Sequence, residues 1–137
     1  AESRRTRVQP GDVLLSITAD LGRTCVIPEG IGETFINQHL ALIRVQGIEP
    51  LYLSAYLASN GGKLQFASRN RNAVKAGLNF DDIRSLRILV PEASLQSRFA
   101  ALVKSTRQIE ARQHRCLQES NDIFNSLSQR AFKGELS

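Results

Sequence analysis

The sequence lacks the residues that mark several classes of protein. Methionine is absent from its 137 residues, so Ala1 is expected to be either a processed start or a cut inside a longer protein. Only two cysteines occur, Cys25 and Cys116, and they lie far apart in the chain. This spacing provides neither a disulfide framework nor a zinc knuckle. We therefore expect a reducing, cytoplasmic location.

Long apolar runs are missing as well. The longest stretch without a charged residue, residues 50–62, is too short and too polar to cross a bilayer. Arginines near the start are followed by the turn signal Pro10-Gly11-Asp12 rather than by the apolar core of a signal peptide. We therefore expect neither a secreted nor a membrane protein.

The residue types that catalysis requires are not clustered. The two histidines, His39 and His114, fall in different parts of the chain, and no Cys/His spacing fits a metal site. No glycine-rich loop matches a phosphate-binding or dinucleotide-binding motif. We interpret His39 as a structural residue at a strand edge, His114 as a solvated helix residue, and both cysteines as small buried apolar residues. The sequence predicts no catalytic site and no metal or other cofactor.

The composition is that of a folded, basic protein. Apolar residues make up 42% and charged residues 23%, and 18 Lys and Arg against 13 Asp and Glu give a net charge of +5. A basic balance favours an anionic partner such as nucleic acid. Residues 50–80 contain no carboxylate, and all their charged residues are basic: Lys63, Arg69, Arg71 and Lys75. This segment is the candidate for phosphate contacts.

Short strands are predicted for the first half of the chain. β-rich runs follow the turn at Pro10 and are separated by polar or glycine-containing loops. They cover residues 13–18, 24–27, 35–36 and 40–45, and a last strand is expected at residues 87–90.

Helices are predicted between and after these strands. Pro50 suits a first helical turn, Asn60-Gly61-Gly62 is expected to break that helix, and residues 69–72 are expected to form a polar loop. Asn79 is a plausible N-cap for residues 80–86, with acidic residues in the first turn.

A long helix is predicted from Ser94 to about residue 133, because this stretch contains neither proline nor glycine. Its apolar residues form one stripe, in which Leu102, Ile109, Cys116 and Ile123 recur at every seventh position. The helix would extend about 60 Å, so residues 1–93 cannot cover it and the stripe needs a partner helix. The expected fold class is α/β (α+β), with a small β-rich domain at residues 1–93 and a long helix at residues 94–137.

Arginine and asparagine alternate in the basic segment, at Arg69, Asn70, Arg71 and Asn72, and Lys75 follows. Arginine pairs with two acceptors of guanine, asparagine pairs with adenine, and lysine neutralises phosphates. The pattern suits a loop that reads base edges, and a merely solvated loop is the alternative.

Four blocks in order carry a family resemblance. The first block is residues 11–18 (GDVLLSIT), continued by Gly22-Arg23 and Val26-Ile27-Pro28, and the second is residues 35–40 (FINQHL). The third block is Leu89-Val90-Pro91, followed by Leu95, Gln96 and Phe99. The fourth is Ser126-Leu127, followed by residues 131–136 (AFKGEL). In order and spacing these blocks resemble the specificity subunits of type I restriction-modification systems. The resemblance spans residues 11–136.

This resemblance implies a non-catalytic DNA-recognition protein. In that family two target recognition domains each read half of a bipartite DNA site, and two long helices pair antiparallel between them. The implied partners are double-stranded DNA, methyltransferase (modification) subunits and the restriction subunit. The uncovered apolar stripe of the long helix leads to one further expectation, that two copies of this chain pair through it. The chain is expected to hold only the later part of a recognition domain, as a C-terminal fragment or a natural half-subunit.

The resemblance also assigns residues to DNA contact. Thr18, Asp20 and Arg23 lie on a loop that faces DNA in the family, whereas Asn37 and Gln38 are assigned to maintaining the fold. The expected DNA-binding residues are Thr18, Asp20, Arg23, Lys63, Arg69, Asn70, Arg71, Asn72 and Lys75. The expected helix-pairing residues are Phe99, Leu102, Ile109, Cys116, Ile123, Phe124 and Leu127.

Two other functions remain open at this point. The chain is alternatively a structural module whose long helix docks a partner protein and whose basic residues are incidental. It is alternatively the terminal recognition domain of a single-chain methyltransferase-restriction enzyme.

Overall fold

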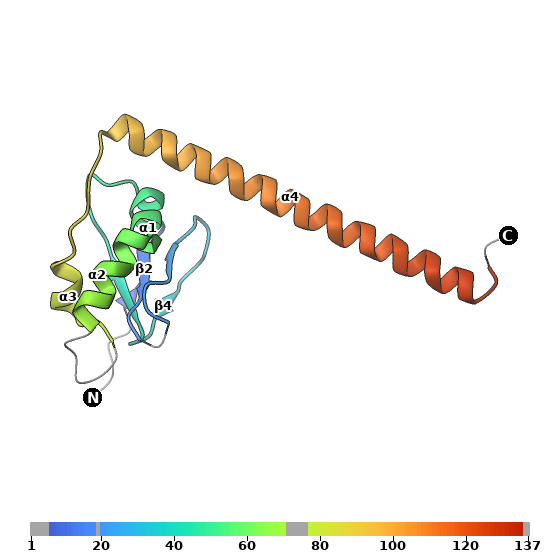
Figure 1. The fold of residues 1–137 in the computed structure, drawn as a ribbon, viewed down its shortest axis with the longest axis horizontal. Helices are drawn as coiled ribbons and strands as arrows, with labels where there is room; N and C mark the ends of the chain where they lie inside the picture. Colours follow the sequence, from blue (N-terminus) through green and yellow to red (C-terminus); the bar gives the residue numbers. More distant parts are fainter. Residues whose placement is uncertain (1–5, 19, 71–76, 136–137) are drawn as a thin grey trace. The chain divides into compact units, whose positions relative to one another are not determined.

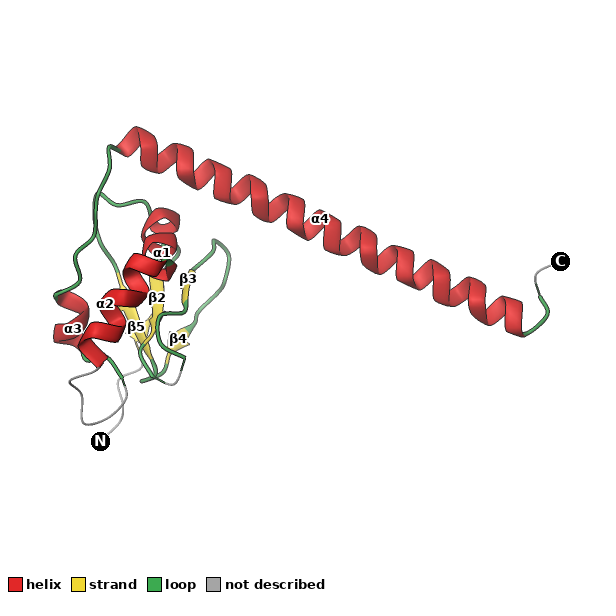
Figure 2. Cartoon of the chain, viewed as in Figure 1, coloured by secondary structure: helices red, strands yellow, loops and turns green. Residues whose placement is uncertain are grey.

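A computed structural model describes residues 6–18, 20–70 and 77–135 (Figures 1 and 2). The chain divides into two compact units, Ala1–Ala100 (unit 1) and Ala101–Ser137 (unit 2). Unit 1 combines short strands with helices, and unit 2 consists mainly of one helix, so the expected mixed α/β class is confirmed. The elements are β1 (Thr6–Arg7), β2 (Val13–Ser16), β3 (Thr24–Val26), β4 (Phe35–Ile36), β5 (Leu40–Ile43), α1 (Pro50–Ala58), α2 (Asn60–Asn70), α3 (Phe80–Arg84) and α4 (Ala93–Phe132).

Strand β2 is the centre of unit 1. It pairs antiparallel with β3 on one side and with β5 on the other, while β1 pairs with β4 in a second small sheet. Side chains alternate along a strand, so Leu15 lies in the larger core, whereas Leu14 lies in a smaller core on the opposite face. The larger core draws on β2, β5, α1, α2 and the residues next to β2 and α3: Val13, Leu15, Ile17, Ala41, Leu53, Leu57, Phe66 and Leu78. Burial of each large apolar side chain stabilises this unit by about 1.5–3 kcal/mol.

Helix α1 begins with Pro50 as expected and ends at Ala58, with Ser59 in an extended conformation, so the predicted break is confirmed close to its expected place. The residues expected to form the break, however, belong to the next helix. Asn60 and Gly61 open α2, and Gly62 is buried inside it. A Cβ on Gly62 would lie 2.1 Å from the Leu57 carbonyl oxygen. Glycine at this position therefore lets α2 start directly after α1.

The predicted polar loop at residues 69–72 is wrong at its start, because Arg69 and Asn70 form the last turn of α2. The Arg69 guanidinium donates to the Gln65 carbonyl oxygen at 3.0 Å, and to Ser85 Oγ and the Ser85 carbonyl oxygen at 2.8 and 2.7 Å. These bonds hold the helical turn and connect it to the residue that follows α3. Arg71 and Asn72 lie outside the described residues.

Helix α3 confirms the predicted N-cap. The Asn79 side chain accepts from the Asp82 backbone N–H, and the Asp82 side chain accepts from the Asn79 N–H, which is a complete capping box. The helix ends at Arg84 rather than at residue 86.

The strand predicted at residues 87–90 is wrong. Within the described ranges these residues pair with no strand. Side-chain hydrogen bonds replace backbone pairing with a neighbouring strand. Tyr52 Oη donates to the Leu89 carbonyl oxygen at 2.6 Å, and the Gln65 side chain both donates to and accepts from the Arg87 backbone. The segment is extended and apolar, but its backbone bonds go to α1 and α2.

Helix α4 confirms the predicted long helix, with 40 residues. Its first turns belong to unit 1, where the buried Gln96 accepts from the Glu49 N–H and donates to the Pro91 carbonyl oxygen, each at 2.8 Å. Phe99 packs edge-to-face on Tyr52, with ring centroids 5.7 Å apart. The helix ends before Gly134, which has a positive φ of 73°.

Both cysteines are exposed, so their interpretation as buried apolar residues is wrong. Cys25 pairs with Leu14 across β3 and β2, but the smaller core on that face, which contains Val8, Leu14 and Ile27, does not extend over it. Cys116 lies on the open stripe of α4. None of the described helices is long and apolar enough to span a membrane.

Candidate nucleic-acid interface

Three segments of unit 1 meet where β2 ends. The Ile17 N–H donates to the His39 carbonyl oxygen at 3.1 Å, which brings in the turn before β5. The Leu78 N–H donates to the Ile17 carbonyl oxygen at 3.0 Å, which brings in the segment before α3. We call the surface formed by residues 18, 20–23, 37–39, 69–70 and 77 the loop end of unit 1.

The loop after β2 supplies three of the predicted contact residues. Thr18 Oγ1 lies 3.0 Å from His39 Nδ1, and the exposed Arg23 forms an ion pair with Asp20 at 2.8 Å. Gly22 makes the loop possible, because its φ is 85° and a Cβ there would lie 2.8 Å from the Phe66 ring. The loop is thus fixed against α2 while its charged side chains face solvent.

The residues that precede and follow positions 71–76, Asn70 and Gly77, both lie at the loop end. The Asn70 side chain accepts from the Gly77 N–H at 2.9 Å, so the residues on either side of positions 71–76 are bonded together. A Cβ on Gly77 would lie 4.0 Å from the Thr18 methyl group, which shows how close the two loops are. The predicted contacts Arg71, Asn72 and Lys75 lie outside the described residues.

Lys63 and Arg69 differ from the other predicted contacts. Lys63 is exposed near the start of α2, about 10 Å along the helix from Asn70, so the structure separates it from the loop end. Arg69 lies at the loop end but directs its guanidinium to Gln65 and Ser85.

Some residues of this surface carried no clear sequence signal. His39 and Gly77 contact the predicted loop, yet a lone histidine and a lone glycine say nothing about which strand end they approach. The side chain of Asn37, which was assigned to maintaining the fold, accepts from the His39 N–H at 3.0 Å. For Gln38 no side-chain hydrogen bond is found within the described residues.

Asp12, in the first resemblance block, is a buried carboxylate that pairs with Arg44. It is buried and accepts from Arg44 Nε and Nη2 at 2.6 and 2.7 Å, and from the Gln9 N–H at 2.7 Å. The Arg44 hydrogen bonds lower the pKa of Asp12 and outweigh burial, which raises it. This pair fixes the start of β2, at the opposite end of the strand from the loop end.

The predicted pairing stripe is open on α4. Large apolar side chains at least 45% exposed follow the helix within unit 2: Leu102, Ile109, Leu117, Ile123, Phe124 and Leu127. Phe99 is the exception among the predicted pairing residues, because it packs on Tyr52 within unit 1.

The described part of the chain contains no group of three or more potential metal ligands. Its titratable side chains at the loop end are Asp20, Arg23, His39 and Arg69. Groups of this kind can contact phosphates and bases.

Comparisons with known proteins agree with the family resemblance. No family model matches the chain. The specificity subunit of the type I restriction enzyme EcoBI from Escherichia coli is 23% identical over 141 residues, which cover 97% of this chain and 29% of that protein. The chain therefore spans less than a third of the length of this relative, and the expected resemblance to type I specificity subunits is confirmed.

A solved structure gives the same fold. A chain from a structural study of complex assembly and conformational transition of the type I R-M system superposes with a TM-score of 0.63 at 21% identity. The match covers 95% of this chain and 35% of that chain.

Proposed function

We propose that this chain is a DNA-recognition part of a type I restriction-modification specificity subunit. Unit 1 is the target recognition domain that reads one half of a bipartite site, and α4 is the spacer helix. The observation that carries the proposal is the similarity to a specificity subunit over 97% of the chain. The domain boundary near residue 93 and the roles of individual residues are parts of this proposal.

The loop end of unit 1 is the proposed DNA-contacting surface. It brings the loop with Thr18 and Arg23 next to Asn70 and Gly77, the residues on either side of positions 71–76. Arg71 and Asn72 are assigned to base edges, and Lys75 to a phosphate. Because three donors of Arg69 are used within the domain, we assign Arg69 to positioning the last turn of α2.

The partners follow from the same proposal. Methyltransferase and restriction subunits supply the methylation and cleavage chemistry, and the present chain directs them to DNA without a catalytic residue of its own. A second copy of the chain, or a second spacer helix, pairs antiparallel with the apolar stripe of α4.

Duplex DNA binding tests the proposal. Selection from a random duplex library is expected to enrich a short motif. Fluorescence anisotropy on that motif should then give a log–log salt slope of about −2 to −4, because each phosphate contact contributes roughly −0.9. Lys104→Ala on α4 is the control and should leave the affinity unchanged.

The helical-module alternative gives a different result. If the chain is such a module, selection from the duplex library enriches no motif. Partner binding is then also retained when Lys63, Arg69, Arg71 and Lys75 are neutralised together. Absence of DNA binding both alone and with a methyltransferase subunit present, combined with intact binding of that subunit by the neutralised variant, would favour the module.

A further inference from the structure

Within the described part of the chain, no strand pairs with the outer edge of β5. The sheet order β3-β2-β5 makes β5 an edge strand, and β2 is its only partner strand among the described residues. The bond from the Ile17 N–H to the His39 carbonyl oxygen sets the alternation of the ladder. Ala41 and Ile43 therefore bond to β2, while the backbone N–H and C=O groups of Leu42 and Arg44 face outward.

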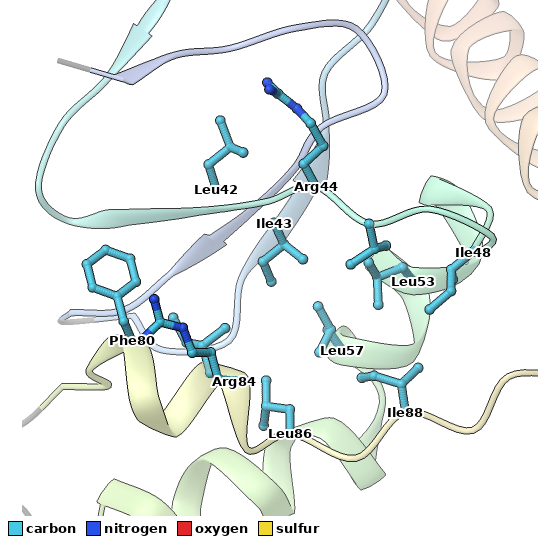
Figure 3. A pocket seen from close by; sticks show the side chains of 12 residues that line it. Leu42, Ile43, Arg44, Ile48, Leu53, Leu57, Phe80, Arg84, Leu86 and Ile88 are labelled. Carbon is cyan, nitrogen blue, oxygen red and sulfur yellow. The ribbon is translucent and has the colours of Figure 1, made fainter.

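Two hollows flank this edge, one on each face of the sheet. The first has a volume of about 510 Å³ and is mostly apolar (Figure 3), with Ile43, Leu53, Leu57, Ile83, Leu86 and Ile88 among its lining residues. The second, of about 380 Å³, is lined by residues such as Ile36, Gln38 and Leu40. Leu42 and Phe80 line both hollows, and the Phe80 side chain is 62% exposed.

Alternating side chains of an added strand match this geometry. In a strand next to β5, successive side chains point to opposite faces of the sheet, so every second residue would enter one hollow and the others would enter the second. An apolar side chain of the added strand would be stabilised most in the first hollow, because that hollow is mostly apolar. Addition of a strand to a sheet edge uses this combination of main-chain bonds and alternating pockets.

The charge of the first hollow specifies the partner further. Arg44 and Arg84 line it, and no carboxylate does. Arg44 is held by the buried Asp12, but Arg84 pairs with Asp81 in an ion pair whose side chains are both more than three-quarters exposed. Such a pair contributes little, so Arg84 exchanges it readily for a carboxylate on a docking segment.

We propose that the outer edge of β5 binds an extended, acidic peptide segment of a partner protein as an additional strand. The segment bonds to the backbone of Leu42 and Arg44, places apolar side chains in the two hollows, and directs a carboxylate to Arg84. The second hollow shares Asn37 and Gln38 with the loop end, but the inference does not depend on the proposed function.

Nuclear magnetic resonance of the full chain tests the backbone part of the proposal. The probe is a capped nine-residue peptide that alternates valine and threonine and carries one glutamate. Saturable binding is expected to slow hydrogen exchange at the Leu42 and Arg44 amides at least tenfold, with a smaller change at Ala41 and Ile43, which are already bonded. Methylation of the peptide amides that face β5 should weaken binding at least tenfold, whereas methylation of the alternate amides should not.

Side-chain variants test the hollows and the charge. Phe80→Ser should weaken peptide binding at least fivefold, and Phe35→Ser is the matched control, because Phe35 is 47% exposed and lines neither hollow. Arg84→Glu should reject the glutamate peptide and prefer one that carries lysine instead.

Three results would overturn the proposal. These are the absence of saturable binding at millimolar peptide, equal effects of the two methylation patterns, and equal losses in Phe80→Ser and Phe35→Ser. Protection of Leu42 and Arg44 that rises with protein concentration without peptide would instead identify a second copy of this chain as the occupant. DNA binding measured on the same variants stays independent of each of these results.

Discussion

At the scale of single residues, the structure shows charged groups in two different roles. Asp12 is a buried charge with a fixed partner, Arg44, and its bonds hold the turn that begins β2. Arg23 and Asp20 form an exposed pair on the loop end, which contributes little to stability and leaves both groups accessible to solvent. Burial therefore separates the residue that supports the fold from those available for recognition.

The Asp12→Asn variant is expected to lose about 1–3 kcal/mol of unfolding free energy at pH 7, since it replaces charge-assisted bonds from Arg44 with weaker ones. The pKa of Asp12 is lowered in the folded chain, so its contribution is complete above the pKa of the unfolded state, about 3.9. It is lost as the pH falls through the lower, folded pKa. The difference between wild type and variant should therefore shrink below about pH 4.

Urea titrations at pH 7, 5 and 3 measure this difference, with tyrosine fluorescence as the readout, because Tyr52 and Tyr56 both lie in α1. Asp81→Asn is the control, since its pair with Arg84 is exposed. A difference that stays constant from pH 7 to pH 3 would show that the Asp12 charge is not what stabilises the turn.

Recognition at the residue scale is tested by Arg71→Ala and Lys75→Ala. If Arg71 contacts a base, its loss should cost about 1–3 kcal/mol on the selected motif and relax specificity at one position. Loss of Lys75 should weaken binding to selected and random duplexes alike and reduce the salt slope by about 1. Competition anisotropy with both duplexes distinguishes the two outcomes, and equal losses on both duplexes for both variants would remove base reading from Arg71.

At the scale of elements, local patterns predicted what local interactions determine. The alternation in β2, Pro50 at the start of α1, the Asn79 cap and the uninterrupted α4 all have signals within a few neighbouring residues. The errors arise where distant residues decide. Residues 87–90 are extended, but bonds from Tyr52 and Gln65 replace a strand partner.

The loop end illustrates the same limit for the candidate site. The sequence identified the loop with Thr18 and the basic segment separately. Their proximity depends on how β2 aligns with β5 and on bonds from Ile17 to His39 and Leu78. Neither contact has a sequence signal, so the sequence indicated the two loops separately but not that they lie together.

The junction of α1 and α2 gives a prediction for two adjacent glycines. Gly62→Ala should destabilise unit 1 by about 1–3 kcal/mol or more, because the new Cβ overlaps the Leu57 carbonyl. Gly61→Ala should be neutral or stabilise by up to about 1 kcal/mol, since its nearest neighbour, Ser59 Oγ, is 3.7 Å away. Thermal unfolding followed by circular dichroism compares them, and equal effects of the two changes would contradict a close contact at Gly62.

At the scale of the whole molecule, the main question is what covers the stripe of α4. A helix in water is stabilised chiefly by packing of its apolar face, and the described residues provide no cover for Ile109 or Ile123, which are 55% and 61% exposed. An interface along a helix of 40 residues is long enough for several turns of side-chain packing between two copies. The proposed pairing through α4 is supported by the exposed face and by the family resemblance.

Ile109→Lys is expected to weaken self-association at least tenfold, because it places a charge in the middle of the stripe. Gln118→Lys is the matched control: it adds the same charge nine residues away, about two and a half helical turns, and thus on the opposite side of α4. Sedimentation equilibrium at tens of micromolar should find wild type and Gln118→Lys dimeric and Ile109→Lys mainly monomeric. A monomeric wild-type chain would contradict pairing between two copies. A repeat of the measurement with a methyltransferase subunit present would then test whether that subunit provides the helix that covers the stripe.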